Sequence, residues 1–195
     1  IQQFFGSKDQ DRFFDSFRYK LVTVLVGFLL MVLLTLLFHQ QIIAFYVRSE
    51  ANPEAITILT KEYLPFIIAS FAFYSFTTAY ATSMREIGKT KEPTIASIIA
   101  FIIQAACNYL FIYILKLGVK GAGIATLIAR LVELAILVIL SEKYQIFPLK
   151  TIFKKFTIDL KLLKTISIKG IPLLISEILW GLGQVLLSLS YAARP

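Results

Sequence analysis

A single acidic side chain, Glu177, lies inside an otherwise uncharged run over residues 170–193. A run of that length and apolar character predicts a membrane-spanning helix. Placing a carboxylate in hydrocarbon is costly, so an ionisable residue within a span marks an ion or substrate pathway by default. The alternative is a structural role near a membrane face, where the side chain reaches the headgroups or accepts a hydrogen bond from another helix. We favour Glu177 as an ion-coupling residue.

Oxygen-bearing neighbours on the same run extend this hypothesis. Ser176 and Gln184 offer the kind of ligand atom that a hard cation such as Na⁺ prefers. A transient Na⁺ at Glu177 is therefore compatible with the sequence, while no permanent metal site is expected. Because desolvation disfavours the charged carboxylate, a lone glutamate can alternate between a cation-bound or protonated state and an empty one.

Two further pairs of polar residues lie within apolar runs. Arg130 and Glu133 are three residues apart, so on a helix they are close enough to form an intramembrane ion pair. Such a pair either locks helices together or faces a wet cavity with a functional role. Gln104 and Asn108 are four residues apart on one predicted helix face, where amides either join helices or line a polar cavity. Both pairs are candidates for a polar lining inside the membrane.

Hydroxyl and aromatic side chains are frequent in the run over residues 63–84. Hydroxyl groups can bond to carbonyls of their own helix without further consequence. Mixed with aromatic rings, they also suit a cavity that holds amphipathic organic cations. The candidates for such a substrate-binding lining are Tyr74, Thr78, Gln104, Asn108, Trp180 and Gln184.

The composition argues against a soluble protein and against most kinds of catalytic site. With 57% hydrophobic residues, 16% charged residues and a mean hydropathy of +0.76, the chain is far from a soluble domain. The single Cys107 and the single His39 leave no internal disulfide, cysteine metal cluster or Ser-His-Asp triad. A Gly-rich phosphate loop is also missing, so the sequence supports neither ATP nor a resident cofactor. An integral membrane enzyme is therefore a weak interpretation.

Five apolar segments predict an all-α integral membrane protein, a polytopic helix bundle. Each has about the 20 residues needed to cross the bilayer core, and a span in lipid must satisfy its own backbone as a helix. Pro65 and Pro172 are expected in first turns, where proline does little harm. The segments cover residues 21–47, 63–84, 94–115, 119–140 and 170–193.

Basic residues are distributed unevenly among the connecting segments, which predicts the orientation in the cell membrane. The side richer in lysine and arginine faces the cytoplasm. We therefore expect the amino end, the turn over residues 85–93 and the connection over residues 142–169 to be cytoplasmic. The net charge of +8 follows from this topology and gives no reason to expect nucleic acid as a partner. The basic residues on that side are Lys8, Arg12, Arg18, Lys20, Arg85, Lys89, Lys91, Lys143, Lys150, Lys154, Lys155, Lys161, Lys164 and Lys169, against Arg48, Lys61, Lys116 and Lys120 on the other.

The connection over residues 142–169 has a helical pattern of its own. Apolar residues recur there at helical spacing, and lysines lie off that stripe. The pattern predicts an amphipathic helix in the cytoplasmic headgroup layer, attracted to anionic lipid; an ordinary soluble linker is the competing interpretation. The stripe consists of Leu149, Ile152, Phe153, Phe156, Leu160 and Leu163.

Several short motifs, in matching order along the chain, resemble a known family. Residues 85–93 (R-E-I-G-K-T-K-E-P) are similar to the R-x-x-G-x-T-x-x-P turn after the fourth span of the multidrug and toxic compound extrusion (MATE) transporters. Residues 108–110 (N-Y-L) and 118–133, with G-V-K-G-A-G-I-A-T and A-R-L-V-E, resemble the next two spans and their loop. Residues 4–9 (F-F-G-S-K-D) resemble the loop after the second span. Residues 170–183, with G-I-P and E-x-x-W-x-x-G, resemble the start of the seventh.

The resemblance implies a fold of twelve helices in two six-helix lobes. Residues 1–141 would form part of the amino-terminal lobe, residues 142–169 the linker between the lobes, and residues 170–195 the first helix of the carboxy-terminal lobe. The chain would then hold spans three to seven. Its partners would be the lipid bilayer and the missing remainder of the same polypeptide.

The resemblance also implies a function. Members of the family exchange Na⁺ or protons for organic, often cationic, compounds and need no other cofactor. Glu177 stands in place of an acidic cation-site residue of one branch. Another branch has an acidic proton-site residue on the fifth span, but here Asn108 stands in that place, with Gln104 nearby. We expect a multidrug efflux antiporter of small organic cations and not an enzyme; the alternatives are a lipid-linked-oligosaccharide flippase of the same superfamily and a non-transporting membrane scaffold.

Overall fold

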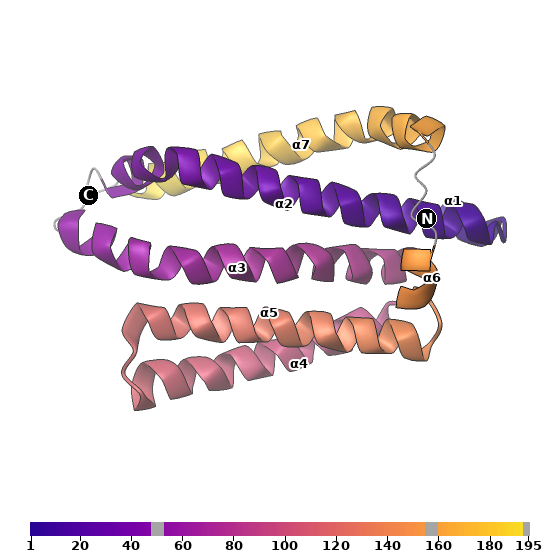
Figure 1. Cartoon of the computed structure of the whole chain (residues 1–195). Helices are drawn as coiled ribbons and strands as arrows, with labels where there is room; N and C mark the ends of the chain where they lie inside the picture. Colours follow the sequence, from indigo (N-terminus) through magenta and orange to yellow (C-terminus); the bar gives the residue numbers. More distant parts are fainter. Residues whose placement is uncertain (48–52, 155–159, 193–195) are drawn as a thin grey trace.

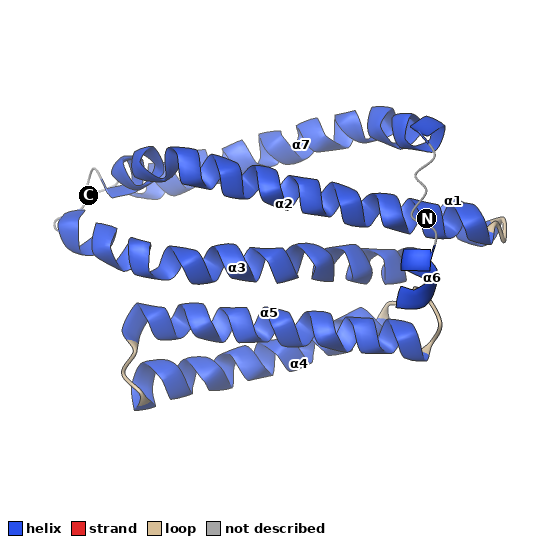
Figure 2. Cartoon of the chain, viewed as in Figure 1, coloured by secondary structure: helices blue, strands red, loops and turns tan. Residues whose placement is uncertain are grey.

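A computed structural model describes residues 1–47, 53–154 and 160–192 of the chain. Within these ranges every regular element is a helix (Figure 2). Long helices lie lengthwise along one another, with α5 between α3 and α4 (Figure 1). The elements are α1 (Gln2–Gly6), α2 (Gln10–Val47), α3 (Pro53–Glu86), α4 (Lys91–Asn108), the π-helical segment η1 (Tyr109–Ile114), α5 (Gly118–Lys143), α6 (Leu149–Lys154) and α7 (Leu160–Ala192).

The described residues contain five helices long and apolar enough to cross a membrane, which confirms the predicted all-α membrane architecture. Several begin earlier than the apolar runs do. Helix α2 starts at Gln10, so its first turns carry Arg12, Asp15 and Arg18. Hydropathy marks only the part of a helix that lies in hydrocarbon, whereas the hydrogen-bonded helix continues into the polar layer.

The two prolines lie inside helices and not in first turns, so that expectation was wrong. Pro65 follows more than two turns of α3, and Pro172 lies well after the start of α7 at Leu160. An interior proline removes one backbone hydrogen bond. Membrane helices tolerate this because side chains and neighbouring helices can satisfy the freed carbonyl.

Small residues let α5 approach its neighbours closely. Gly121, Gly123, Ala125 and Ala129 are all buried on this helix. A Cβ added at Gly123 would lie 2.9 Å from the Cβ of Phe66 on α3, closer than side-chain atoms normally come. Such strips allow helices to pack through van der Waals contact where lipid provides no hydrophobic driving force.

At one end of the bundle, the segment after α5 is anchored to α2. The buried ring of Phe147 stacks on Phe17, with ring centroids 4.0 Å apart. Arg18 donates from Nε to the backbone oxygen of Ile152 (2.7 Å) and from Nη2 to that of Thr151 (2.6 Å). These carbonyls belong to the last turn of α6, where a helix leaves acceptors free. Residues 146–152 are thereby held against the base of α2.

The predicted amphipathic helix over residues 149–163 differs from what the structure describes. Helix α6 covers its first part, residues 155–159 lie outside the described residues, and Leu160 already begins α7. Ile152 is fully buried in protein, while Leu149 and Phe153 are exposed. The apolar stripe therefore does not face lipid throughout, because the aromatic core at the base of α2 covers Ile152.

Of the described residues, none from α7 belongs to the hydrophobic core. None of its apolar stretch Gly170–Ser188 is buried within the described residues. Of the predicted last segment, residues 193–195 lie outside the description. Most side chains of α7 whose burial is described are exposed, among them Ile171, Glu177 and Tyr191.

Candidate functional site

A polar cavity of about 350 Å³ lies within the membrane-spanning part of the bundle, where α3, α4 and α5 meet. Its polar lining comes from three helices that follow one another in the chain. Five residues singled out from the sequence line it: Tyr74, Thr78, Gln104, Arg130 and Glu133. Tertiary packing thus brings together the hydroxyl, amide and ion-pair candidates of three predicted spans.

Glu133 is the buried charge of this cavity. It lies on α5 and is 5% exposed. One carboxylate oxygen accepts a hydrogen bond from Nη1 of Arg130 at 2.8 Å, and the other accepts one from Oγ of Ser97 at 2.7 Å. A buried charge requires such partners, since an uncompensated carboxylate would be strongly destabilising. The predicted ion pair between residues 130 and 133 therefore forms, and Ser97 completes it.

Arg130 also faces an aromatic ring. Its guanidinium carbon lies 4.7 Å from the ring centroid of Tyr74 on α3. The negative face of an aromatic ring attracts a cation, and the attraction grows when both groups are desolvated. The cavity therefore surrounds a cation with one ring and one carboxylate, contributed by two different helices.

Amide and hydroxyl groups supply further polar atoms in this region. Gln104 donates from Nε2 to Oγ1 of Thr126 at 3.3 Å, so it joins α4 to α5. Oγ1 of Thr77, which lines the cavity, has no hydrogen-bond partner among the described residues, and the same is true of Oδ1 of Asn108. Native proteins rarely leave buried polar atoms unpaired. The oxygen of Thr77 is therefore both unpaired and buried beside the cavity.

In the described part of the chain, the candidate residues on α7 do not line this cavity. Glu177, Trp180 and Gln184 are all exposed there, and Glu177 forms no hydrogen bond or ion pair with a described residue. No group of three His, Cys, Asp or Glu residues within the described ranges is placed to hold a metal ion. Asn108 is not among the residues that line the cavity. The ion site at Glu177 stays a prediction.

Sequence reasoning missed Ser97 as a partner of the buried carboxylate. A signal was present, because Ser97 and Gln104 are seven residues apart and therefore share one helix face. What the sequence lacked was the rotation of α4 relative to α5, which decides that this face meets Glu133.

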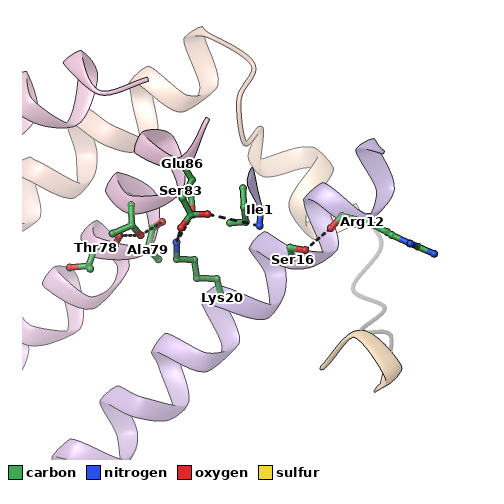
Figure 3. Close-up of polar contacts among 9 residues, drawn as sticks. Ile1, Arg12, Ser16, Lys20, Thr78, Ala79, Ser83 and Glu86 are labelled. Atoms are coloured by element: carbon green, nitrogen blue, oxygen red, sulfur yellow. Dashed lines mark hydrogen bonds and ion pairs between the residues drawn. The ribbon is translucent and has the colours of Figure 1, made fainter. Parts of the chain in front are cut away.

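A second polar cluster joins the ends of α2 and α3 (Figure 3). Nζ of Lys20 lies 3.0 Å from Oγ of Ser83 and 3.0 Å from Oε1 of Glu86. Ser83 is fully buried, whereas Glu86 is partly exposed. A pair of this kind holds two helix ends together and resembles no substrate site.

Comparison with known families gives one match, to the MatE family model over residues 1–110. That range is more than half of the chain and runs from α1 through α4 into η1. The chain belongs to the MATE family. It is therefore a MATE-type transporter sequence, of the superfamily that includes efflux pumps and flippases, and the helices of this multi-pass protein contact the bilayer.

The range matched by the family model contains only some of the candidate site residues. It includes Tyr74, Ser97 and Gln104, whereas Arg130, Glu133 and Glu177 lie beyond residue 110. No significant match was found among curated proteins or among solved structures. The roles of the residues on α5 and α7 therefore depend on physical argument.

Proposed function

We propose that this chain belongs to a cation-coupled efflux antiporter, which exchanges Na⁺ or protons for small organic cations. The observation that carries the proposal is the position of Arg130, between the Tyr74 ring and the Glu133 carboxylate. A guanidinium is itself a planar organic cation. A cavity built to hold it contains the two groups, an aromatic face and a buried anion, that recognise such a substrate.

Arg130 in this proposal is a tethered competitor of the substrate. An organic cation that enters the cavity of about 350 Å³ meets the same ring and the same carboxylate. The hydroxyl of the exposed Thr78 provides an additional acceptor. Because the site stays electrically compensated when substrate is absent, Glu133 need not be left as an isolated buried charge.

Coupling to the ion gradient is assigned to Glu177 on α7. A carboxylate in a span is stabilised when it binds Na⁺ or a proton and is destabilised when empty. Ser176 and Gln184 on the same helix are proposed as additional oxygen ligands for Na⁺. In the complete transporter, a two-lobe arrangement would place this helix opposite the amino-terminal lobe.

We further propose that the chain holds spans three to seven of twelve, with the amino end and residues 85–93 and 142–169 cytoplasmic.

The test uses Tyr74, because its substitution leaves the ion pair intact. In the complete transporter reconstituted in vesicles, Tyr74→Leu removes the ring and should raise the KM for ethidium or tetraphenylphosphonium about fivefold to thirtyfold. Tyr74→Phe keeps the ring and should stay near the parental KM. Tyr109→Leu is the matched control, because Tyr109 is exposed on η1 outside the cavity. An unchanged KM in Tyr74→Leu would contradict the proposal.

One observation favours the flippase alternative. The cavity is lined by two cationic residues, Arg85 and Arg130, against the single carboxylate of Glu133. An excess of positive charge suits an anionic, lipid-linked substrate. In the same vesicles, translocation of a lipid-linked oligosaccharide without ethidium export would establish the flippase, and the absence of both activities would indicate a scaffold.

A further inference from the structure

A second and larger pocket, of about 620 Å³, lies at the end of the bundle where α1 and α6 are found (Figure 1). Its walls come from the α1–α2 junction, from the turn after α3 and from the segment after α5. This pocket is separate from the polar cavity and shares no residue with it. Its volume is in the range of ordinary ligand sites.

The walls of the pocket are mainly aromatic and aliphatic. Phe4, Phe5, Phe13 and Phe14 line one side. Phe13 is fixed by stacking on the buried Phe147, with ring centroids 5.1 Å apart. Phe5 remains 52% exposed. A wall of this kind buries an acyl chain better than it does a fully hydrated ion.

The rim of the pocket is basic. Lys8 and Lys89 both line it, are both exposed, and form no ion pair with a described carboxylate. The ammonium group of Lys89 lies over the ring of Tyr144, which also lines the pocket, at 5.4 Å from the ring centroid. Asp9 is the one acidic residue in the lining, and Arg12 lies 3.6 Å from its carboxylate. The rim therefore keeps a positive charge that no described residue neutralises.

We propose that this pocket binds the headgroup and upper acyl region of an anionic phospholipid. The pocket lies at the helix ends, which is the depth of the headgroup layer for helices that cross a bilayer. Lysines near that layer attract anionic lipid, and basic pockets between membrane helices bind such headgroups. A lipid fits the pocket better than a free phosphate does, because a phosphate would make no use of the apolar part of the wall. This lipid site goes beyond the transport function, since the pocket shares no residue with the polar cavity proposed to bind the substrate.

The proposal is tested by lipid competition on the complete transporter. After purification, retention of phosphatidylglycerol relative to phosphatidylcholine is measured by native mass spectrometry. The parental protein should prefer phosphatidylglycerol, and Lys8→Gln and Lys89→Gln should each reduce that preference about fivefold. The matched control is Lys116→Gln, an exposed lysine at the opposite end of α4–η1, which should leave the preference unchanged.

A second measurement compares the thermal midpoint of each variant with and without lipid, so that differences in expression or stability between the variants do not affect the result. Phosphatidylglycerol should raise the thermal midpoint of the parental protein and of Lys116→Gln, but not that of the double variant Lys8→Gln/Lys89→Gln. Equal retention of the two lipids by the parental protein would overturn the proposal. Displacement of the lipid by equimolar glycerol phosphate would also overturn it, because the pocket would then be a site for a soluble anion.

Discussion

At the scale of single residues, Arg130 and Glu133 stabilise the fold as well as forming the proposed site. Each compensates the charge of the other inside the bundle, at 2.8 Å. Removing Arg130 leaves the buried carboxylate of Glu133 without its cation and is strongly destabilising, so loss of transport in such a variant would not distinguish folding from function. Tyr74 is free of this problem, because it contributes an uncharged ring. The most informative substitutions are therefore those beside the ion pair.

Glu177 provides a residue-scale prediction for coupling. In the complete transporter, Glu177→Gln keeps the shape of the side chain and removes its charge. It should abolish export driven by a Na⁺ or proton gradient, because an amide neither takes up a proton nor balances a bound cation. Expression and membrane insertion should stay near parental values. Export at the parental rate under the same gradient would show that Glu177 is only structural.

At the scale of elements, α5 determines how the polar cavity is assembled. It packs against both α3 and α4 and carries two of the charged groups of the cavity. Its small-residue strip sets the spacing to α3, at Phe66, and to η1, at Phe111. A shift of α5 would therefore move Arg130 and Glu133 relative to Tyr74 and Ser97. Packing and chemistry are coupled through this one helix.

The close approach at Gly123 gives an element-scale prediction. Gly123→Ala adds a Cβ where Phe66 leaves no space, and should destabilise the protein by about 1–3 kcal/mol through overpacking. The same change at Gly27, which has open space around it, should be neutral or slightly stabilising because alanine favours a helix. Thermal unfolding of both variants in detergent measures the difference. Equal midpoints for the two would contradict the observed α3–α5 packing.

At the scale of the whole molecule, the two ends of the bundle differ in character. One end carries the aromatic core around Phe147, the Arg18 bonds to α6 and the basic pocket. At the other end, the turn between η1 and α5 carries Lys116 and exposed apolar residues. The uneven charge predicts that the first end is cytoplasmic. The proposed lipid pocket and the connection between the proposed lobes would both lie at this cytoplasmic end.

This orientation is open to a direct measurement. Single cysteines at Thr90 and Lys116 lie in turns at opposite ends of the helices, once Cys107 is replaced by alanine. In intact cells, a membrane-impermeant maleimide should label Lys116→Cys alone, and labelling of Thr90→Cys should require permeabilised cells. Labelling of both from outside, or of Thr90→Cys alone, would contradict the topology.

The sequence by itself determined the five helices, the class of protein and the chemistry available inside the membrane. Spans are readable in sequence because crossing the hydrocarbon core requires about 20 predominantly apolar residues in succession. The pairing of Arg130 with Glu133 was equally local, since two residues three positions apart on a helix lie at a known separation. Helix ends were less predictable, as at Gln10 and Leu160. Both helices begin in polar turns, and no apolar run marks those turns in the sequence.

Only the tertiary structure decided which helix faces meet. It placed Ser97 against Glu133 and Tyr74 against Arg130, and it buried Ile152 beneath α2, where the sequence predicted a lipid-facing stripe. It also left Glu177 outside the polar cavity in the described residues. These outcomes depend on the rotation and spacing of each helix, which are set by contacts such as Gly123 with Phe66. No single segment encodes such contacts, because each needs side chains from two helices at once.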